Sequence, residues 1–280
     1  MPLARTTLSL ALLFAVHALA DDRGVDVRRQ IAYSSPAGQD LLLDAYVPRG
    51  EGPFPAVVVI HGGSWKSGDR FQLGAHAWWF ASQGIAAFSI DYRLAPDHKW
   101  PAQIHDCKAA VRWIKSHAPE FRVDPDRVGA YGYSAGGHLA LLLGVADAAV
   151  GLEGDAPEGA PDTRVRAVAA GGAPVEFRDV QPRSRGFVYW LGATLEESPE
   201  TYRLCSPAAH VDATDPPCFL FHGTADVIVS MADPRLMTRE LESAGVEHAM
   251  HEVPLAGHIG AAMSPRAVRE AGEFLLEHLR

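Results

Sequence analysis

The sequence predicts an α/β fold in which a mostly parallel sheet is covered by helices on both faces. Short apolar segments with strand character alternate with amphipathic helical segments along the 280 residues, which is typical of such folds. The run Pro55–Ile60 is apolar at every position, as expected for a strand that is buried on both faces. Residues 85–90 repeat this pattern. The length fits one large α/β domain, which we place at residues 21–280.

The chain opens with a predicted hairpin, in which strands 27–34 and 40–47 flank the turn-forming residues 35–38. Six further strands are expected later in the chain: 55–60, 85–90, 126–131, 165–170, 217–222 and 246–253. The alternation with helices makes these later strands mainly parallel to one another.

Three helices are expected between or after these strands. Residues 101–117 place apolar side chains at helical spacing, and Pro101 stands where the first turn of a helix tolerates proline. Residues 137–144 are almost wholly apolar and predict a buried helix. The last helix starts at Ser264-Pro265, with its apolar residues on one side.

Two segments interrupt the alternation of strands and helices. Residues 146–163 are rich in Gly, Pro, Asp and Glu and predict a solvated loop. Residues 181–210 carry aromatic side chains without a strand pattern. Because this second segment is long enough to cover a site, we interpret it as a candidate lid or cap insertion.

Residues 1–20 have the three parts of a secretory signal peptide. Arg5 is followed by an apolar run that is too short to span a bilayer, and the segment ends in small residues at Ala20. A membrane anchor or a buried helix is the alternative. We expect cleavage near Ala20, a secreted or periplasmic protein, and no membrane span in the remaining chain.

The charge of the chain argues against a nucleic-acid partner. The net charge is −9, from 25 basic and 34 acidic residues, and the basic residues are not clustered as phosphate binding requires. No metal is expected either. His248 and His251 lie on a predicted strand at an odd separation, which points them to opposite faces.

The three cysteines have no spacing typical of zinc or redox sites. In an oxidising compartment Cys205 and Cys218 could pair and leave Cys107 free. We favour the alternative of three buried thiols, because Cys107 lies on the apolar stripe of a predicted helix and Cys218 begins an apolar strand.

The segment Gly132–Gly136, GYSAG, fits the pattern that places a serine on a strained turn between a strand and a helix. A predicted strand precedes it and a predicted buried helix follows it, which is the context that the pattern requires. The two glycines allow the strand and helix backbones to approach closely. Ser134 is therefore a candidate nucleophile.

An acyl-transfer serine needs a base, a carboxylate that orients the base, and donors for the oxyanion. Asp226 and His258 each follow a predicted strand, so they are expected at one edge of the sheet. The chain order of serine, aspartate and histidine differs from that of chymotrypsin-like and subtilisin-like proteases. The segment HGGSW, 61–65, suggests that the amides of Gly63 and Ser64 stabilise the oxyanion together with that of Ala135.

Together, HGGSW, residues 89–101, GYSAGGHLA and HGTAD resemble the α/β-hydrolase superfamily. Within it the chain is most similar to secreted esterases of the hormone-sensitive-lipase-like and feruloyl-esterase-like (BD-FAE-like) groups. The resemblance implies an eight-stranded sheet with a reversed second strand, carboxylic-ester hydrolysis by the triad of Ser134, Asp226 and His258, and no cofactor. It also places Arg93 and Asp106 at positions that structure the core, for which we expect a buried ion pair.

The resemblance leaves the substrate open. Short-chain or polysaccharide-linked acetyl or feruloyl esters are expected, with Trp65 and Tyr133, which adjoin the catalytic motifs, lining the substrate pocket. The HGGxW form is also found in kynurenine formamidases, so amide cleavage is an alternative. A catalytically inactive, binding-only member of the fold is a second alternative.

Overall fold

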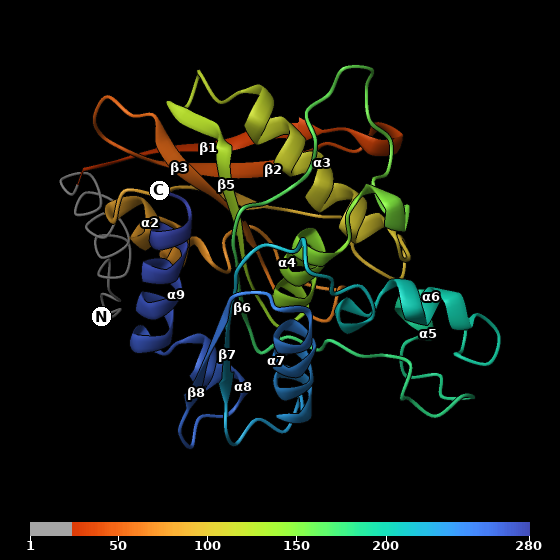
Figure 1. Ribbon diagram of the computed structural model, residues 1–280. Helices are drawn as coiled ribbons and strands as arrows, with labels where there is room; N and C mark the ends of the chain where they lie inside the picture. Colours follow the sequence, from red (N-terminus) through yellow and green to blue (C-terminus); the bar gives the residue numbers. More distant parts are fainter. Residues whose placement is uncertain (1–23) are drawn as a thin grey trace, which may run out of the picture.

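The structure, a computed structural model, describes residues 24–280. The expected signal peptide lies outside this range. Eight strands form one sheet in the order β1-β2-β4-β3-β5-β6-β7-β8 (Figure 1). Their bounds are β1 Val25–Ser34, β2 Leu41–Pro48, β3 Phe54–Ile60, β4 Ala86–Ile90, β5 Val123–Tyr133, β6 Val168–Gly171, β7 Cys218–Gly223 and β8 His248–Val253.

The sheet is parallel except around its second strand. β2 pairs antiparallel with both β1 and β4, and the pairs from β4 to β8 are all parallel. This confirms the predicted α/β class and the eight-stranded sheet with a reversed second strand. β3 is the central strand, and Ala56–Ile60 are fully buried because helices cover both faces.

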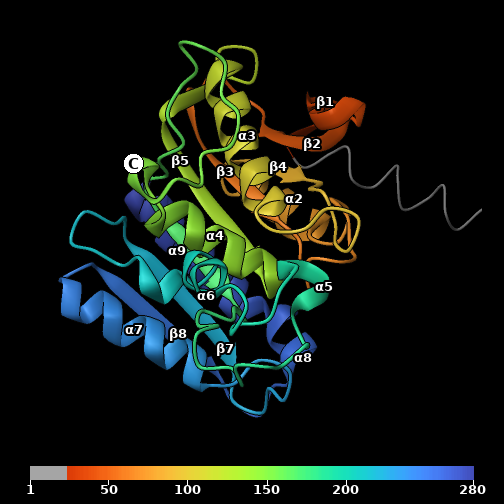
Figure 2. The same cartoon turned by 90° about the vertical axis from the view of Figure 1, so that its right-hand side faces the viewer.

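Two apolar cores flank the sheet, one on each face. The core on one face is filled by side chains from α3 (Ala102–Ser116), α4 (Ala135–Val145) and α7 (Ala232–Ala244). The other core is filled by side chains from α2 (Gly74–Ser82) and α9 (Pro265–His278). Figures 1 and 2 show these helices on the two sides of the sheet. The predicted coverage of both faces is therefore confirmed.

The predicted helices are all present, with small shifts at their ends. α3 matches 101–117 with Pro101 as the residue before its first turn, and α4 starts two residues earlier than expected. The N-terminus of α9 is capped by Ser264, whose hydroxyl accepts a hydrogen bond of 3.3 Å from the amide of Ala267.

Two of the longer helices, α2 and α7, were not predicted. The sequence of α2, GAHAWWFAS, has almost no polar face, so it lacks the amphipathic period that marks a surface helix. α7 does carry such a period, with Met237 and Leu241 buried one turn apart. It ends at Gly245, which has a φ of 73° and supplies the left-handed residue that terminates many helices.

The predicted solvated loop 146–163 is only partly solvated. The buried ammonium group of Lys108 donates hydrogen bonds to the Ala146 carbonyl and to Thr163, and it pairs with Glu153. Arg112 also pairs with Glu153. The loop is polar because its charges meet partners on α3, and sequence composition does not reveal this pairing.

The remaining segment 181–210 forms short helices: α5 (Val188–Leu191), α6 (Pro199–Leu204) and the 3₁₀ turn η3 (Pro207–Ala209). Trp190 and Tyr202 are fully buried in the core that α4 shares. Other short helices are η1 (Pro36–Gly38), η2 (Ala148–Val150) and α8 (His258–Ala262). No helix within residues 24–280 is long and apolar enough to cross a membrane.

Three other predictions about the core are resolved by the structure. Arg93 and Asp106 form the expected ion pair, with 2.7 Å between guanidinium and carboxylate. All three cysteines are buried and free, so the favoured interpretation is confirmed and the pairing of Cys205 with Cys218 is wrong. The thiols of Cys205 and Cys218 both lie inside the apolar core that is filled by α3, α4 and α7.

Candidate active site

Ser134 lies on a strained turn between β5 and α4. Its φ of 58° is in the left-handed region, which a residue with a side chain seldom adopts. The turn is held by main-chain hydrogen bonds, one from the Ser134 amide to the Gly171 carbonyl and one from the His138 amide to the Ser134 carbonyl. This geometry presents the hydroxyl at the carboxyl end of a central strand, as the sequence pattern predicts.

The glycines beside Ser134 are required by close backbone contacts. A Cβ atom on Gly132 would lie 2.1 Å from the carbonyl oxygen of Gly136. A Cβ atom on Gly136 would lie 2.0 Å from the carbonyl oxygen of Ile60, at the end of β3. Because real Cβ atoms do not approach other atoms this closely, a larger residue at either position would displace the turn.

His258 and Asp226 complete a hydrogen-bonded chain with Ser134. The imidazole Nε2 of His258 lies 2.9 Å from Ser134 Oγ, and its Nδ1 lies 2.6 Å from Asp226 Oδ2. Since a carboxylate can only accept, Nδ1 carries the proton, and Nε2 is free to accept from the serine hydroxyl. The three residues that the sequence singled out are therefore brought together from three separate loops.

The carboxylate of Asp226 is buried and fully supported by hydrogen bonds. Burial opposes its ionisation, but hydrogen bonds from His258 and from the amides of Val229 and Ile228 hold its pKa below the ordinary value. The side chain is 0% exposed. Asp226 is thus kept charged beside His258.

His222 is a further histidine of this site that the sequence analysis did not single out. Its Nε2 lies 3.0 Å from the Val229 carbonyl and 3.3 Å from Asp226 Oδ2. Burial lowers the pKa of His222, so the ring is neutral. Its position in the HGTAD segment, four residues before Asp226, was the only signal in the sequence.

The loop after β3 has an unusual backbone. Gly63, Ser64 and Trp65 all have positive φ, at 109°, 54° and 58°. The Gly63 carbonyl accepts hydrogen bonds from the amides of Lys66 and Ser67 on the inner side of the loop. In a trans peptide the N–H points opposite to the C=O, so the Ser64 amide is directed away from these partners.

The same relation holds for the two neighbouring amides. The Gly62 carbonyl lies 2.7 Å from His61 Nδ1, so the Gly63 amide points the opposite way. The Ser134 carbonyl accepts from His138 within α4, so the Ala135 amide points outward from the N-terminus of this helix. Gly63, Ser64 and Ser134 all line one pocket.

The strained loop is supported from the segment 181–210. The indole of Trp65 stacks on that of Trp190 in α5, with ring centroids 3.6 Å apart. The Tyr189 hydroxyl donates a hydrogen bond of 2.9 Å to the Ser64 carbonyl. α5, which belongs to the segment 181–210, therefore packs against this loop through one buried ring stack and one exposed hydrogen bond.

His138 of α4 contacts the same aromatic cluster. Trp65 Nε1 donates to His138 Nδ1 at 3.2 Å, and His138 Nε2 donates to the Cys205 carbonyl at 2.7 Å. Burial lowers the pKa of His138 to about 3, so the ring is neutral and can accept the indole proton. This pair fixes the orientation of the Trp65 indole.

Trp65 is placed differently from the sequence expectation. Its indole is 3% exposed and lies among the buried aromatic side chains, and it is not among the residues that line the pocket. Tyr133 does line the pocket, and its hydroxyl donates a hydrogen bond to the His258 carbonyl. Both residues adjoin catalytic motifs in the sequence, and this could not show that Trp65 points into the core whereas Tyr133 points into the pocket.

The pocket at Ser134 has a volume of about 410 Å³. Its wall is mainly apolar and is formed by the loops after β3, β5, β7 and β8. The lining residues are Gly62, Gly63, Ser64, Gln72, Leu73, His76, Tyr133, Ser134, Ile228, His258, Ile259, Ala262 and Met263. A polar serine and histidine therefore face a space suited to a small, largely apolar group.

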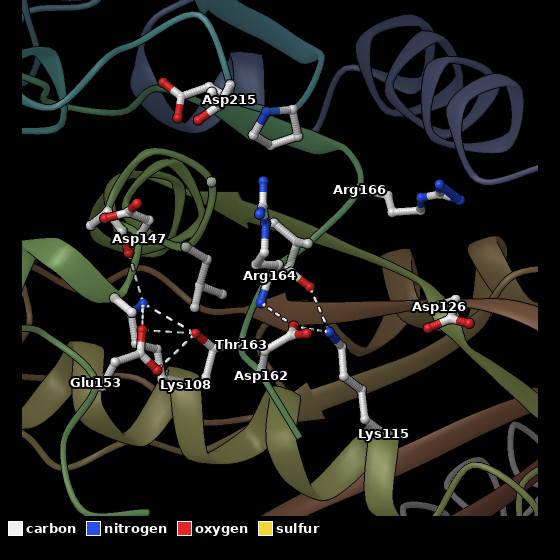
Figure 3. Close-up of a pocket in the computed structure, with 17 residues that line it drawn as sticks. Lys108, Lys115, Asp126, Asp147, Glu153, Asp162, Thr163, Arg164, Arg166 and Asp215 are labelled. Carbon is white, nitrogen blue, oxygen red and sulfur yellow. Dashed lines mark hydrogen bonds and ion pairs between the residues drawn. The ribbon is translucent and has the colours of Figure 1, made fainter. Parts of the chain in front are cut away.

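A larger cavity of about 710 Å³ lies at the other end of the strands, near the residues that precede β6 and β7 (Figure 3). It is lined by charged side chains. Lys108 pairs there with Glu153, and Lys115 pairs with Asp162. The charges of each pair neutralise one another, and no serine, cysteine or histidine lines this cavity, in contrast to the pocket at Ser134.

No group of three or more His, Cys, Asp or Glu side chains in residues 24–280 is arranged to hold a metal ion. His251 instead pairs with Glu270 at 2.7 Å, and His248 contacts the Val246 carbonyl. The two histidines of β8 are engaged separately within the fold.

Comparison with curated proteins identifies esterases as relatives. The chain is 33% identical to the esterase LipC of Mycobacterium tuberculosis over 242 residues, which are 82% of this chain and 59% of LipC. It covers 59%, 55% and 60% of three mycobacterial relatives, so it spans somewhat more than half the length of the curated relatives it matches.

Two solved structures share the fold over nearly their whole length. One is a truncated form of a carbohydrate esterase from gut microbiota, with a TM-score of 0.79 and 25% identity, covering 92% of this chain and 98% of that one. The other is an esterase of Thermogutta terrifontis with propionate bound, with a TM-score of 0.76 and 28% identity, covering 91% and 94%. Both likenesses support the α/β-hydrolase fold.

A family comparison covers most of the chain. The BD-FAE family matches residues 43–241, a span that runs from β2 into α7 and includes Ser134 and Asp226. His258 follows this span, and the structure brings it to the other two residues. The chain therefore belongs to the BD-FAE family of α/β-hydrolases.

Proposed function

We propose that the protein is a serine carboxylic-ester hydrolase that works through an acyl-enzyme. The observation that carries this proposal is the chain of hydrogen bonds from Ser134 through His258 to Asp226, at 2.9 Å and 2.6 Å. Ser134 Oγ attacks the ester carbonyl while His258 Nε2 takes the hydroxyl proton. The alcohol then leaves with that proton, and water releases the acyl group by the same base.

Asp226 has an orienting and electrostatic role in this mechanism. Its charged carboxylate holds the proton on His258 Nδ1, which leaves Nε2 as the acceptor. It also stabilises the imidazolium that forms when His258 takes the serine proton. The low pKa of Asp226 is consistent with a group that stays ionised throughout the cycle.

The proposed oxyanion donors are the main-chain amides of Gly63, Ser64 and Ala135. The carbonyls of the same peptides are engaged on the inner side of the loop or within α4, which directs the amides outward. The Ala135 amide also lies at the N-terminus of an 11-residue helix, where partial positive charge favours an anion. Such donors stabilise the tetrahedral intermediate without reorganising during the reaction.

The proposed acyl group is short. The pocket of about 410 Å³ has room for a small acyl group together with part of the alcohol. The related carbohydrate esterase and the propionate-bound esterase support acetyl or similar groups, with polysaccharide-linked acetyl or feruloyl esters as one candidate class.

The test uses the wild-type protein and Ser134→Ala. Wild type is expected to hydrolyse p-nitrophenyl acetate and to be labelled by a fluorophosphonate probe, whereas Ser134→Ala shows neither with unchanged circular dichroism. Ester turnover that persists in the folded variant would disprove the mechanism. Labelling also separates an enzyme from a binding-only protein.

A substrate panel decides between the remaining candidates. It contains p-nitrophenyl esters of increasing acyl length, acetylated xylan, a feruloyl ester and N-formylkynurenine. The proposal expects the highest kcat/KM for short-chain esters. A higher kcat/KM for N-formylkynurenine would indicate a formamidase, the activity that the HGGSW segment left open.

A further inference from the structure

A group of exposed apolar side chains surrounds the mouth of the catalytic pocket. Seven large apolar side chains are exposed among residues 24–280, and five of them lie either on the loop after β7 that carries Asp226 or on the segment 255–263 that carries His258 and includes α8. We call these five the apolar collar: Val227, Ile228, Leu255, Ile259 and Met263. Each is between 65% and 96% exposed, so none of them contributes to the core.

The apolar collar is continuous with the pocket. Ile228, Ile259 and Met263 line the same space as Ser134 and His258. Val227 precedes Ile228 in the chain and Leu255 stands three residues before His258, and both side chains are exposed. Grouped exposed apolar side chains of this kind mark binding surfaces, because scattered ones are normal whereas clusters are costly to leave in water.

The two loops of the apolar collar are fixed to each other. The Leu255 amide donates a hydrogen bond of 2.8 Å to Thr224 Oγ1, and the Ala225 amide donates one of 3.0 Å to the Ala256 carbonyl. Leu255 has a φ of 58°, a conformation that suits glycine or asparagine better than leucine. An exposed leucine therefore stands where local structure alone would favour a small or polar residue.

The reaction chemistry determines which part of an ester meets this surface. His258 Nε2 must return the serine proton to the leaving alcohol, so the alcohol oxygen lies within hydrogen-bond reach of that atom. The carbonyl oxygen lies on the other side, at the amides of Gly63, Ser64 and Ala135. The alcohol group consequently leaves the pocket past Ile259, which follows His258 in the chain, and past Ile228 and Met263.

We propose that the apolar collar is the binding subsite for an aliphatic leaving alcohol, so that the preferred substrates are short-chain esters of apolar alcohols. This inference rests on the proposed esterase function. The collar side chains offer no hydrogen-bond donors or acceptors. A sugar alcohol bound there would lose hydrogen bonds to water without replacement, whereas an aliphatic alcohol would gain from leaving water.

The test compares two substrate series and an acetylated xyloside at concentrations below their solubility limits, and hexyl acetate is also assayed above its limit. Ethyl, butyl and hexyl acetate vary the alcohol, and ethyl acetate, butyrate and hexanoate vary the acyl group. Burial of each methylene favours binding by up to about threefold to fourfold. We expect kcat/KM to rise by about tenfold or more from ethyl to hexyl acetate, with no comparable rise in the acyl series.

The variants are Ile228→Ser and Met263→Ser, one from each loop. Both side chains are exposed, so neither change empties the core. Each variant is expected to lower kcat/KM for hexyl acetate by about fivefold to tenfold more than it lowers kcat/KM for ethyl acetate. The matched control is Val27→Ser, an exposed apolar residue on β1 at the opposite edge of the sheet, which is expected to change neither substrate.

Four results would overturn the assignment. Equal losses for ethyl and hexyl acetate would show that the collar only supports His258. Losses that follow acyl length would place the acyl chain on the collar. A higher kcat/KM for an acetylated xyloside than for hexyl acetate would make the alcohol a sugar. A rate that rises only above the solubility limit would show docking to a lipid surface.

Failure of the esterase proposal itself gives a different result. In that case no ester of either series is hydrolysed, and the fluorophosphonate probe does not label Ser134 in wild type. Normal labelling together with any of the four results above rejects the alcohol subsite alone.

Discussion

The hydroxyl of Tyr189 donates a hydrogen bond of 2.9 Å to the main-chain carbonyl of Ser64. This contact joins α5, in the long segment before β7, to the loop that follows β3. The loop has three consecutive residues with positive φ, so its conformation depends on such outside support. A residue that never touches the substrate can therefore set the position of the proposed oxyanion amides.

Tyr189→Phe is expected to lower kcat for p-nitrophenyl acetate by about threefold to tenfold, the range that one lost hydrogen bond produces. KM is expected to stay within about twofold, because the amides act mainly on the transition state. Steady-state kinetics measure both constants. The control is Tyr202→Phe, which removes a hydroxyl bound to the Ala193 carbonyl in the same segment. An equal effect of both variants would contradict the positioning role.

Asp226→Asn is expected to reduce kcat by about 10³-fold to 10⁴-fold with the fold intact. The amide cannot hold the proton on His258 Nδ1, so Nε2 is no longer the acceptor for the serine proton. The measurement is kcat at neutral pH together with the thermal midpoint. Asp215→Asn, a neutralised carboxylate at the other end of the sheet, serves as the control for kcat alone. A loss below about tenfold would remove Asp226 from the mechanism.

Ser64→Gly is expected to leave kcat within about threefold, because the proposed donor at this position is a backbone amide. Its φ of 54° suits glycine, so the change also relieves local strain. Ser64→Ala keeps the backbone strain and removes only the hydroxyl, so comparing the two variants separates the effect of the hydroxyl from the effect of the strain. A loss of about 10²-fold in both variants would show instead that the serine hydroxyl takes part in catalysis.

Asp215 is expected to make stability fall as the pH rises. Burial, with repulsion from Asp212 and Asp147, raises the pKa of Asp215 from 3.8 to about 7. Between pH 3.8 and about pH 7, Asp215 loses its proton in the unfolded chain but keeps it in the folded protein, and this difference favours unfolding. The resulting loss in the free energy of unfolding is absent below pH 3.8 and complete above about pH 7.

Asp215→Asn removes this penalty, since the amide oxygen can still accept from the Asp212 amide. The variant is expected to have a higher urea midpoint than wild type at pH 8 and the same midpoint at pH 4. Urea denaturation at both pH values checks this. A difference between variant and wild type that does not change with pH would contradict the raised pKa.

The triad could be predicted because each member follows a strand whose pattern is strong. Ser134 stands between an apolar strand and an apolar helix, and Asp226 and His258 each follow one of the last two strands. Parallel strands bring their carboxyl ends to one edge, so local patterns were enough to place the three residues together.

The supporting residues could not be predicted in the same way. Trp65, Tyr189 and Trp190 meet only through tertiary packing of segments that are far apart in the chain. Nothing in the local sequence distinguishes an indole that lines a pocket from one that stacks beneath it. The helix α2 was missed for a related reason, because its almost uniformly apolar sequence has no periodicity.

The apolar collar was also invisible in the sequence. Val227 and Ile228 continue an apolar stretch, which would ordinarily suggest burial, and only the fold shows that they project into solvent. The proposed role of these side chains in binding the alcohol depends on the position of His258, which a different segment of the chain supplies.

The three unpaired thiols have a consequence for how the protein can be made. Cys107, Cys205 and Cys218 are enclosed in the apolar core, and burial raises the pKa of each. Their covalent state is therefore insensitive to glutathione or mild oxidants while the fold is intact. Since no disulfide joins these cysteines in the folded protein, the fold does not depend on an oxidising compartment.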